Sequence, residues 1–293
     1  MLWCGGLQRG GKVLGSQFWG RRGLCLAQRV LSLGSYVAEG SGLRSDRLRA
    51  QIRHSDSAEA LGLGRAIVEA KVQKQIVILQ RFGRRDHGEL VRDAISSMRR
   101  VLMLLPDCQT TPEAMGIEGA AAAVYFPVLG ALMPEGLKFQ HRSRQPPLDV
   151  ANSALSFLYT VMLGECVTAL YAAGLDPGIG VLHTDDERRP SLALDLLEEF
   201  RPMVVEQVVV SSARLGALKA SHSRVEEGRS GVMLTKGGRE ALLEAYERRM
   251  LTRTRGAIPD FGGTIRRHLY RQAQRLQASI SDPSVQWTGM SWR

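Results

Sequence analysis

The sequence predicts a mainly α-helical protein, and three observations support this fold class. From residue 57 onward, apolar side chains recur with the spacing of amphipathic helices. The segment 150–173 is apolar for most of its length, as expected of one long core helix. Hydrophobic residues make up 44% of the 293 residues, which is enough for the core of one large or two small domains. We find no internal repeat and no low-complexity tract.

The individual helices are predicted from local signals along the chain. The first extends through Arg81, and its apolar stripe includes Ala66, Ile67, Ala70 and Val77. A second is expected from about Glu89 to Leu105. The residues Thr111, Pro112 and Glu113 are typical of a helix N-terminus, so a third helix should begin there. Further helices are expected over about residues 150–173, 190–202, 239–252 and 264–279.

The charge of the chain indicates a polyanionic partner. The formal net charge is +10, which favours nucleic acid first and an anionic membrane surface second. We expect no membrane span, because Arg29, Lys138 and Glu165 interrupt the apolar runs. The cysteines are widely spaced and form no CxxC pair, which is typical of incidental thiols in a reducing compartment: Cys4, Cys25, Cys108 and Cys166.

A histidine and several acidic residues lie close together in the sequence around residues 183–202. His183 precedes a short polar loop and a helix in which Asp195 and Glu198 are three residues apart, so both carboxylates lie on one face. Pro190 suits the first turn of this helix, and Pro202 predicts a break or kink after it. A bound cation would relieve the repulsion between the carboxylates, and this donor set suits Mg²⁺ or Mn²⁺ better than structural zinc. The spacing alone favours the alternative, a solvated acidic patch beside a loop histidine.

Several further segments match one known protein family in the same order along the chain. Residues 116–122 read GIEGAAA and fit the helix motif G-x-E-G-x-A-A. Matching segments follow at residues 124–126, 144–149, 152–157, 172–177, 234–235 and 244–249. From about residue 60 to its end the chain therefore resembles the CRISPR-associated integrase of spacer acquisition, the nuclease of the CRISPR adaptation step. Several colinear motifs make this resemblance specific, where one alone would be weak.

The resemblance implies a set of metal ligands and a reaction. The ligands would be Glu118, His183 and Glu198, with Asp195 as an added acid, and the metal Mg²⁺ or Mn²⁺. Helix geometry alone does not choose Glu198 over Glu199. In the implied reaction, the 3′-hydroxyl of a captured DNA fragment attacks a phosphodiester at the edge of a CRISPR repeat. Water in place of the hydroxyl gives nuclease activity.

The resemblance also implies an assembly and a cellular location. The family works as a pair of dimers bridged by a small ferredoxin-like partner protein, in the cytoplasm of prokaryotes. Residues 57–293 would form the helical catalytic domain. Family members normally begin with a β-rich domain of roughly a hundred residues, for which too little chain precedes residue 57.

The N-terminal segment 1–56 is thus expected to be an atypical basic leader followed by a remnant of the β-rich domain. Residues 1–38 contain no acidic residue, and residues 34–40 fit the tail of that domain. An acid-free, arginine-rich leader can resemble an organelle transit peptide, but the prokaryotic family argues against import. We interpret the chain as truncated at its N-terminus. Dimerisation should then be weak or absent, since the β-rich domain supplies much of the dimer contact in the family.

Two arginine-rich regions are candidates for DNA binding. The first contains Arg142 and Arg144, before a proline pair. The second region, residues 248–275, contains eight arginines and one acidic residue, Asp260. The candidates in it are Arg248, Arg249, Arg266 and Arg267. A charge run is most often a solvated face, yet crowded arginines repel one another without counterions. Given the resemblance, we favour phosphate binding.

Three functions remain possible from the sequence. The first is an active integrase and endonuclease, for which every implied ligand is present. The second is a truncated DNA-binding remnant that does not assemble and has no integrase activity. The third is a helical protein with an unrelated structural role. A metal-dependent strand-transfer assay separates the first two, and the third would show no metal binding and a weak salt dependence of its DNA affinity.

Overall fold

The computed structural model describes residues 43–83, 87–183, 189–225 and 230–292. Its α-helices are α2 (Leu43–Ser55), α3 (Glu59–Gly83), α4 (Gly88–Leu102), α5 (Thr111–Ala131), α6 (Val150–Ala173), α7 (Ser191–Phe200), α8 (Gln207–Arg214), α9 (Lys236–Met250) and α10 (Ile265–Ser281). A π-helical turn, Arg201–Glu206, joins α7 to α8. Two short antiparallel hairpins pair β1 (Ser223–Arg224) with β2 (Met233–Leu234) and β3 (Arg253–Ile258) with β4 (Phe261–Thr264). The mainly helical fold class is confirmed.

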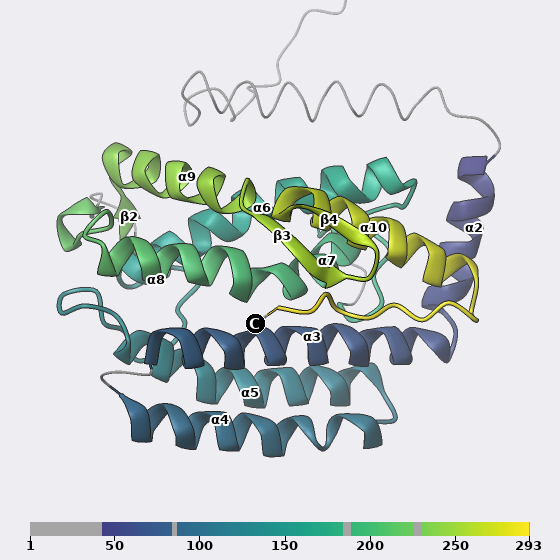
Figure 1. Cartoon of the computed structure of the whole chain (residues 1–293), viewed down its shortest axis with the longest axis horizontal. Helices are drawn as coiled ribbons and strands as arrows, with labels where there is room; N and C mark the ends of the chain where they lie inside the picture. Colours follow the sequence, from purple (N-terminus) through teal and green to yellow (C-terminus); the bar gives the residue numbers. More distant parts are fainter. Residues whose placement is uncertain (1–42, 84–86, 184–188, 226–229, 293) are drawn as a thin grey trace, which may run out of the picture.

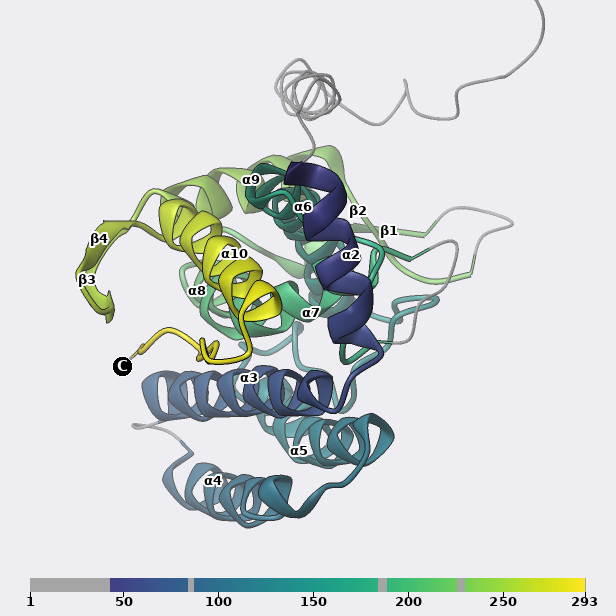
Figure 2. The same cartoon turned by 90° about the vertical axis from the view of Figure 1, so that its right-hand side faces the viewer.

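Helix α3 separates two groups of helices (Figures 1 and 2). On one side it packs against α4 and α5, and on the other against α7 and the π-helical turn. Helices α6, α9 and α10 complete the second group around α7. Because α3 contacts both groups, its side chains can reach acidic residues on α5 and α7 together. This position of α3 determines the geometry of the candidate site.

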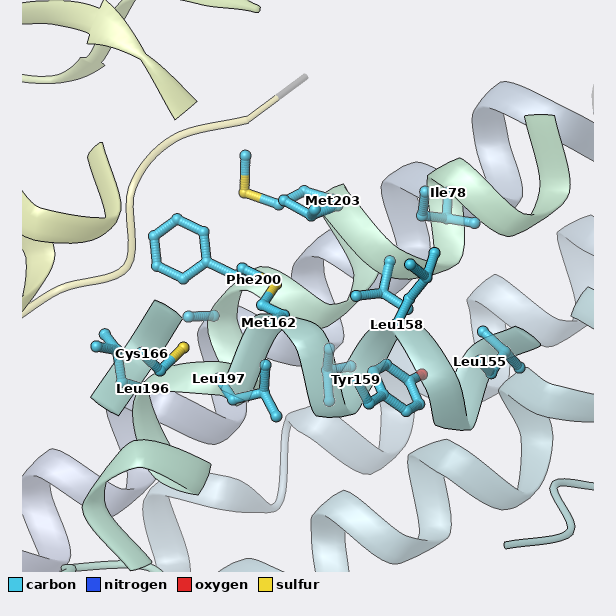
Figure 3. Packing of buried hydrophobic residues seen from close by; sticks show 14 of the residues in the cluster. Ile78, Leu155, Leu158, Tyr159, Met162, Cys166, Leu196, Leu197, Phe200 and Met203 are labelled. Atoms are coloured by element: carbon cyan, nitrogen blue, oxygen red, sulfur yellow. The ribbon is translucent and has the colours of Figure 1, made fainter. Parts of the chain in front are cut away.

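Helix α6 is the central helix of the second group, and its apolar composition is that of a core helix. Leu155, Leu158 and Met162 of α6 are fully buried and pack with Phe200 and Met203 (Figure 3). The sequence predicted both ends of α6 correctly because both carry local signals. The side chain of Asp149 caps the N-terminus by accepting a hydrogen bond from the backbone N–H of Asn152 at 2.7 Å. Gly174 ends the helix in the left-handed conformation with φ of 79°.

By length and hydropathy alone, α5 and α6 could each cross a membrane, contrary to our expectation that no apolar segment reaches that length. In the fold, 67% of the most apolar window of α6 is buried inside the protein. A buried core helix has the same composition as a membrane span, so this composition fits the packing of α6. The corresponding window of α5 is 39% buried.

Several element boundaries differ from the sequence-based expectation. Helix α4 ends at Leu102 rather than at residue 105, because a separate 3₁₀ turn containing Pro106 follows. Helix α9 begins earlier than residue 239, at Lys236, where the Thr235 side chain caps it. The break expected at Pro202 is the π-helical turn, which continues into α8. The two hairpins were not expected.

The helical part also begins before residue 57, where we placed its boundary. Helix α2 contacts α3 and α10, and the Gln51 amide donates hydrogen bonds to the carbonyls of Asp176 and Ile179. Residues 43–55 therefore pack on the helical body instead of forming part of a β-rich remnant. The rest of the predicted leader, residues 1–42, lies outside the described residues, as do Cys4 and Cys25.

Candidate metal centre

Glu118 on α5 and Glu198 on α7 meet at one ammonium group, that of Lys71 on α3. The Lys71 Nζ atom forms ion pairs with Glu118 Oε1 and with Glu198 Oε2, the latter at 2.5 Å. The side chains of Lys71 and Glu198 are each 4% exposed, whereas that of Glu118 is 23% exposed. The two carboxylates, 80 residues apart in the sequence, thus share one cation, and the accessible side of the pair is at Glu118.

Arg201 holds the second oxygen of Glu198. Its Nη1 donates to Glu198 Oε1 at 2.5 Å, one helical turn along the chain. Burial by itself raises the pKa of Glu198, but the charges of Arg201 and Lys71 outweigh burial and lower this pKa to about 2. Glu198 is therefore ionised at neutral pH, which is the form that a metal ion requires.

Asp195 orients His183 and the backbone before it. Its carboxylate is fully buried and accepts hydrogen bonds from the backbone N–H groups of Val181, Leu182 and His183. Its Oδ1 also lies 2.7 Å from His183 Nδ1, so Nε2 is the ring nitrogen left for a ligand. Burial lowers the pKa of His183, but the hydrogen bond and charge of Asp195 raise it above its ordinary value overall. These hydrogen bonds suit Asp195 to positioning His183, and its task as an added acid of the site stays a prediction.

The three predicted ligands come into one neighbourhood. The charges of Glu198 and Lys71 both affect the pKa of His183, as expected of neighbouring groups. Within the described residues, no three His, Cys, Asp or Glu side chains are grouped tightly enough to hold a metal ion. The ammonium of Lys71 lies between the two carboxylates. Two carboxylates and an imidazole fit Mg²⁺ or Mn²⁺, and such an ion would take the place of the ammonium.

Glu199, the neighbour of Glu198, belongs to a different part of the molecule. It is fully buried and accepts from Lys74 Nζ at 3.0 Å, from Gln272 Nε2 at 2.7 Å and from the backbone N–H of Met290 at 2.5 Å. Glu199 therefore joins α7 to α3, α10 and the C-terminal segment. The structure distinguishes the two glutamates by their partners, which helix geometry could not do.

A buried network lies beside Arg201. Glu206, at the end of the π-helical turn, accepts hydrogen bonds from the hydroxyls of Tyr125 at 2.6 Å and Tyr159 at 2.8 Å. The guanidinium of Arg201 lies 4.2 Å from the centre of the Tyr159 ring, a cation–π contact. Tyr159 is thus a buried core residue, and it fixes the arginine that holds Glu198.

Asparagine at position 195 should weaken metal binding without removing any ligand. In Asp195→Asn, one carboxylate oxygen is replaced by an NH₂ group, which cannot accept hydrogen bonds. Some of the backbone and imidazole donors then lose their acceptor, so His183 loses its orientation. Loss of such a supporting group typically lowers metal affinity by about 10–100-fold. Titration with Mn²⁺ by calorimetry measures this effect. Asp176→Asn, in the segment before the site, is the control, and an unchanged affinity in Asp195→Asn would contradict the positioning role.

The predicted DNA-binding arginines divide into an inward group and an exposed group. Arg142 points inward and donates to Asn152 Oδ1 at 2.9 Å and to Ser156 Oγ at 2.8 Å. Arg249 also points inward, and its Nε donates to the carbonyl of Met203 at 2.9 Å. Both side chains therefore have partners within the protein, and their contact with DNA phosphates stays a prediction.

Arg266 is inward as well, because its guanidinium bridges Glu165 and Glu247 with hydrogen bonds of 2.7–3.2 Å. These partners could not be predicted from the charges alone, because both glutamates are far from residue 266 in the sequence. The remaining candidates are exposed: Arg144, Arg248 and Arg267.

Lys71 and Lys74 are the residues that the sequence analysis did not single out for the site. The available signal was two lysines three residues apart in a helix, followed far along the chain by two adjacent glutamates. Lysine is almost never fully buried without a partner, and both lysines are 3% exposed. The partners, however, become apparent only once α3 and α7 pack together.

Comparison with known proteins gives a consistent family match. The family model described as CRISPR associated protein Cas1 matches residues 26–248. A CRISPR-associated endonuclease Cas1 of Thermus thermophilus is 37% identical over 253 residues, which cover 85% of this chain and 75% of that protein. Another, from Rhodospirillum rubrum, is 36% identical over 240 residues, or 78% of this chain and 69% of that protein.

Solved structures show the same fold. A casposase bound to an integration product has a TM-score of 0.73 and 22% identity, covering 85% of this chain and 68% of that one. A Cas1 protein from Thermotoga maritima has a TM-score of 0.69 and 24% identity, covering 79% and 69%. A chain of a Cas6-RT-Cas1–Cas2 complex has a TM-score of 0.75 and 23% identity, covering 84% of this chain and 27% of that one.

Proposed function

The chain belongs to the Cas1 family of CRISPR-associated proteins, and from this membership we propose that it is a metal-dependent DNA integrase and endonuclease that inserts new spacers into a CRISPR array. The observation that carries the proposal is the meeting of Glu118 and Glu198, from separate helices, at a single cation beside His183. A surface acidic patch would be solvated, whereas Glu198 is almost completely buried. A buried carboxylate and a partly exposed one, held together by one cation, favour a metal site over a solvated patch.

The residues of the site have distinct tasks in this proposal. Glu118, His183 and Glu198 hold Mg²⁺ or Mn²⁺, Arg201 keeps Glu198 ionised, and Asp195 presents the Nε2 of His183. When bound, the divalent ion polarises the phosphodiester and stabilises charge on the leaving oxygen. The 3′-hydroxyl of the incoming fragment forms a new phosphodiester as the phosphodiester of the repeat breaks. One phosphodiester replaces another, so the reaction needs no external energy source. Water in the same position gives hydrolysis.

The partners follow from the charge of the surface and from the relatives. The net charge of +10 and the exposed arginines favour DNA as the substrate. Structural neighbours include a Cas6-RT-Cas1–Cas2 complex and a casposase on an integration product. By the family resemblance, the partner protein is a small ferredoxin-like adaptation protein in the cytoplasm of a prokaryote. The family assembles from homodimers, and for this chain we expect a weak dimer or none.

A strand-transfer assay tests the proposal. The protein is mixed with a short duplex fragment carrying free 3′-hydroxyls and a supercoiled plasmid carrying a CRISPR repeat, with and without the partner protein. Joining should require Mn²⁺ or Mg²⁺ and should disappear with EDTA. If the protein bound DNA but joined no fragment in the presence of Mn²⁺ or Mg²⁺, the integrase proposal would be contradicted. That result would favour a DNA-binding protein without this activity.

Arg144 and Arg142 should differ in their effect on DNA binding. Arg144→Ala removes an exposed charge and should weaken binding to all sequences, with the salt dependence of log K falling by about 1 in slope. Arg142→Ala removes buried hydrogen bonds and should instead lower the melting temperature. Fluorescence anisotropy at several salt concentrations, together with thermal melts, measures both effects. Equal loss of salt slope in the two variants would show that Arg142 also reaches phosphate.

A further inference from the structure

Lys71 occupies the position between Glu118 and Glu198. It is a 3% exposed lysine on α3, and its sequence neighbours Ala70 and Val72 are both buried. Its ammonium contacts both carboxylates. A divalent ion that joined the same two carboxylates would need this position. Two cations in contact with one carboxylate pair repel each other strongly in a buried site, so the ammonium and the metal exclude one another.

We propose that Lys71 is a built-in counter-cation, which holds the two carboxylates together in the metal-free protein and which the metal ion must displace. The inference rests on the proposed function, because it takes Glu118 and Glu198 as metal ligands. It assigns to Lys71 a task that the family comparison does not. The metal-binding state of the site then depends on a movement of this one side chain.

The two basic residues at the site differ in their freedom to move. Arg201 is held by its bond to Glu198 and by the ring of Tyr159, and both are buried. Lysine carries a compact charge on a flexible four-carbon stem, and the ammonium of Lys71 forms its ion pairs with the two carboxylates themselves. Glu118 is the more exposed of the pair, at 23% against 4%. Lys71 is thus the cation that can leave, and the side at Glu118 is the way out.

The displacement has a consequence for metal affinity. While the ammonium holds the carboxylates, the site is not available to the metal, and the apparent dissociation constant is the intrinsic one divided by the fraction of time that the site is open. The ammonium that leaves carries its charge toward the accessible side of the site. A phosphodiester arriving there would meet both the metal and this charge. Metal binding should therefore be stronger in the presence of DNA.

Substitution of Lys71 by methionine tests the inference. Lys71→Met keeps the length and apolar stem but removes the charge, so the metal no longer competes with it. Calorimetric titration of the full-length protein with Mn²⁺ should give a dissociation constant at least about tenfold lower than that of the wild type. The metal-free variant should melt at a lower temperature, because two carboxylates then face each other without a cation. Its gain in melting temperature on adding Mn²⁺ should exceed the gain of the wild type.

Two matched variants separate this effect from general changes in stability. Lys74→Met removes a lysine equally buried and one helical turn away, but its partner is Glu199, outside the site. It should lower the melting temperature and should not tighten Mn²⁺ binding. Lys71→Arg keeps the charge and should not show the tenfold tightening, and it remains informative if Lys71→Met does not fold.

The possible outcomes distinguish the inference from the proposed function. Unchanged or weaker Mn²⁺ binding in Lys71→Met, with normal binding in the wild type, would overturn the role of Lys71 and leave the proposed function intact. Equal tightening in Lys74→Met and Lys71→Met would also overturn it. Absence of Mn²⁺ binding in the wild type and in Lys71→Met would overturn both. Binding only in Lys71→Met would support the inference in its strongest form.

Discussion

Glu118→Gln, His183→Gln and Glu198→Gln should each lower Mn²⁺-dependent joining by about a thousandfold or more, because loss of a metal ligand removes several kcal/mol of transition-state stabilisation. DNA affinity should change little, since it depends on exposed arginines that lie outside the site. Glutamine preserves the volume of the glutamate side chain, so the helices should stay packed. Initial rates with a labelled fragment measure joining, and anisotropy measures DNA binding.

Two neighbouring glutamates provide controls for these variants. Glu113→Gln lies on α5, as Glu118 does, but in its exposed first turn, and should join DNA at the wild-type rate. Glu199→Gln is adjacent to Glu198 and retains an amide oxygen for Lys74, so it should keep most of its activity. If a folded Glu199→Gln lost as much activity as Glu198→Gln, the ligand assignment would be wrong. The three ligand variants should also lose the thermal stabilisation by Mn²⁺ that an ion bound only to the folded state provides.

The second large effect is on stability, at Glu199. Glu199→Ala should destabilise the fold by about 3–5 kcal/mol, because it leaves the buried ammonium of Lys74 without its carboxylate. The same substitution also removes the acceptor for Gln272 and for the backbone N–H of Met290. Urea unfolding followed by circular dichroism gives the free energy of unfolding and its change. Alanine at position 199 is therefore unsuitable as a control for position 198.

A double variant tests the cause of that loss. Lys74→Met with Glu199→Leu replaces the ion pair by two apolar side chains, and replacing a buried pair in this way is often neutral or stabilising. It should recover most of the stability lost in Glu199→Ala. A loss of less than about 1 kcal/mol in Glu199→Ala is what removal of an exposed ion pair would give. It would contradict a strong contribution of the buried Lys74–Glu199 pair to stability.

The parts of the fold that the sequence predicted well have local causes. Both ends of α6 were predicted because Asp149 caps one and Gly174 ends the other. The start of α5 was predicted for the same reason, since the Thr110 side chain accepts from the backbone N–H of Glu113, with a proline in the first turn. Such signals operate within one helical turn. They need no knowledge of which helices pack together.

The site could be predicted from the sequence only in part, because its contacts join distant segments. The resemblance supplied Glu118, His183 and Glu198, but the cation between the two glutamates comes from α3, whose packing no local pattern specifies. Asp195 was predicted as an added acid of the site, but its hydrogen bonds with three backbone N–H groups and an imidazole were not predicted. Likewise, Arg266 was predicted as one of the DNA-binding arginines, because its two glutamate partners could not be identified from the sequence. In each case the missing information was a tertiary partner.

The two ion pairs between α3 and α7 also fix the rotation of α7 about its own axis. Successive residues of a helix point about 100° apart, so Glu198 and Glu199 meet Lys71 and Lys74 from two directions. A roll of α7 in either sense would pull one carboxylate away from its lysine. The direction in which the proposed metal ligand Glu198 points therefore depends in part on Lys74, which does not touch the metal. Among relatives, exchanges at positions 74 and 199 should therefore occur together, even though neither residue takes part in the chemistry.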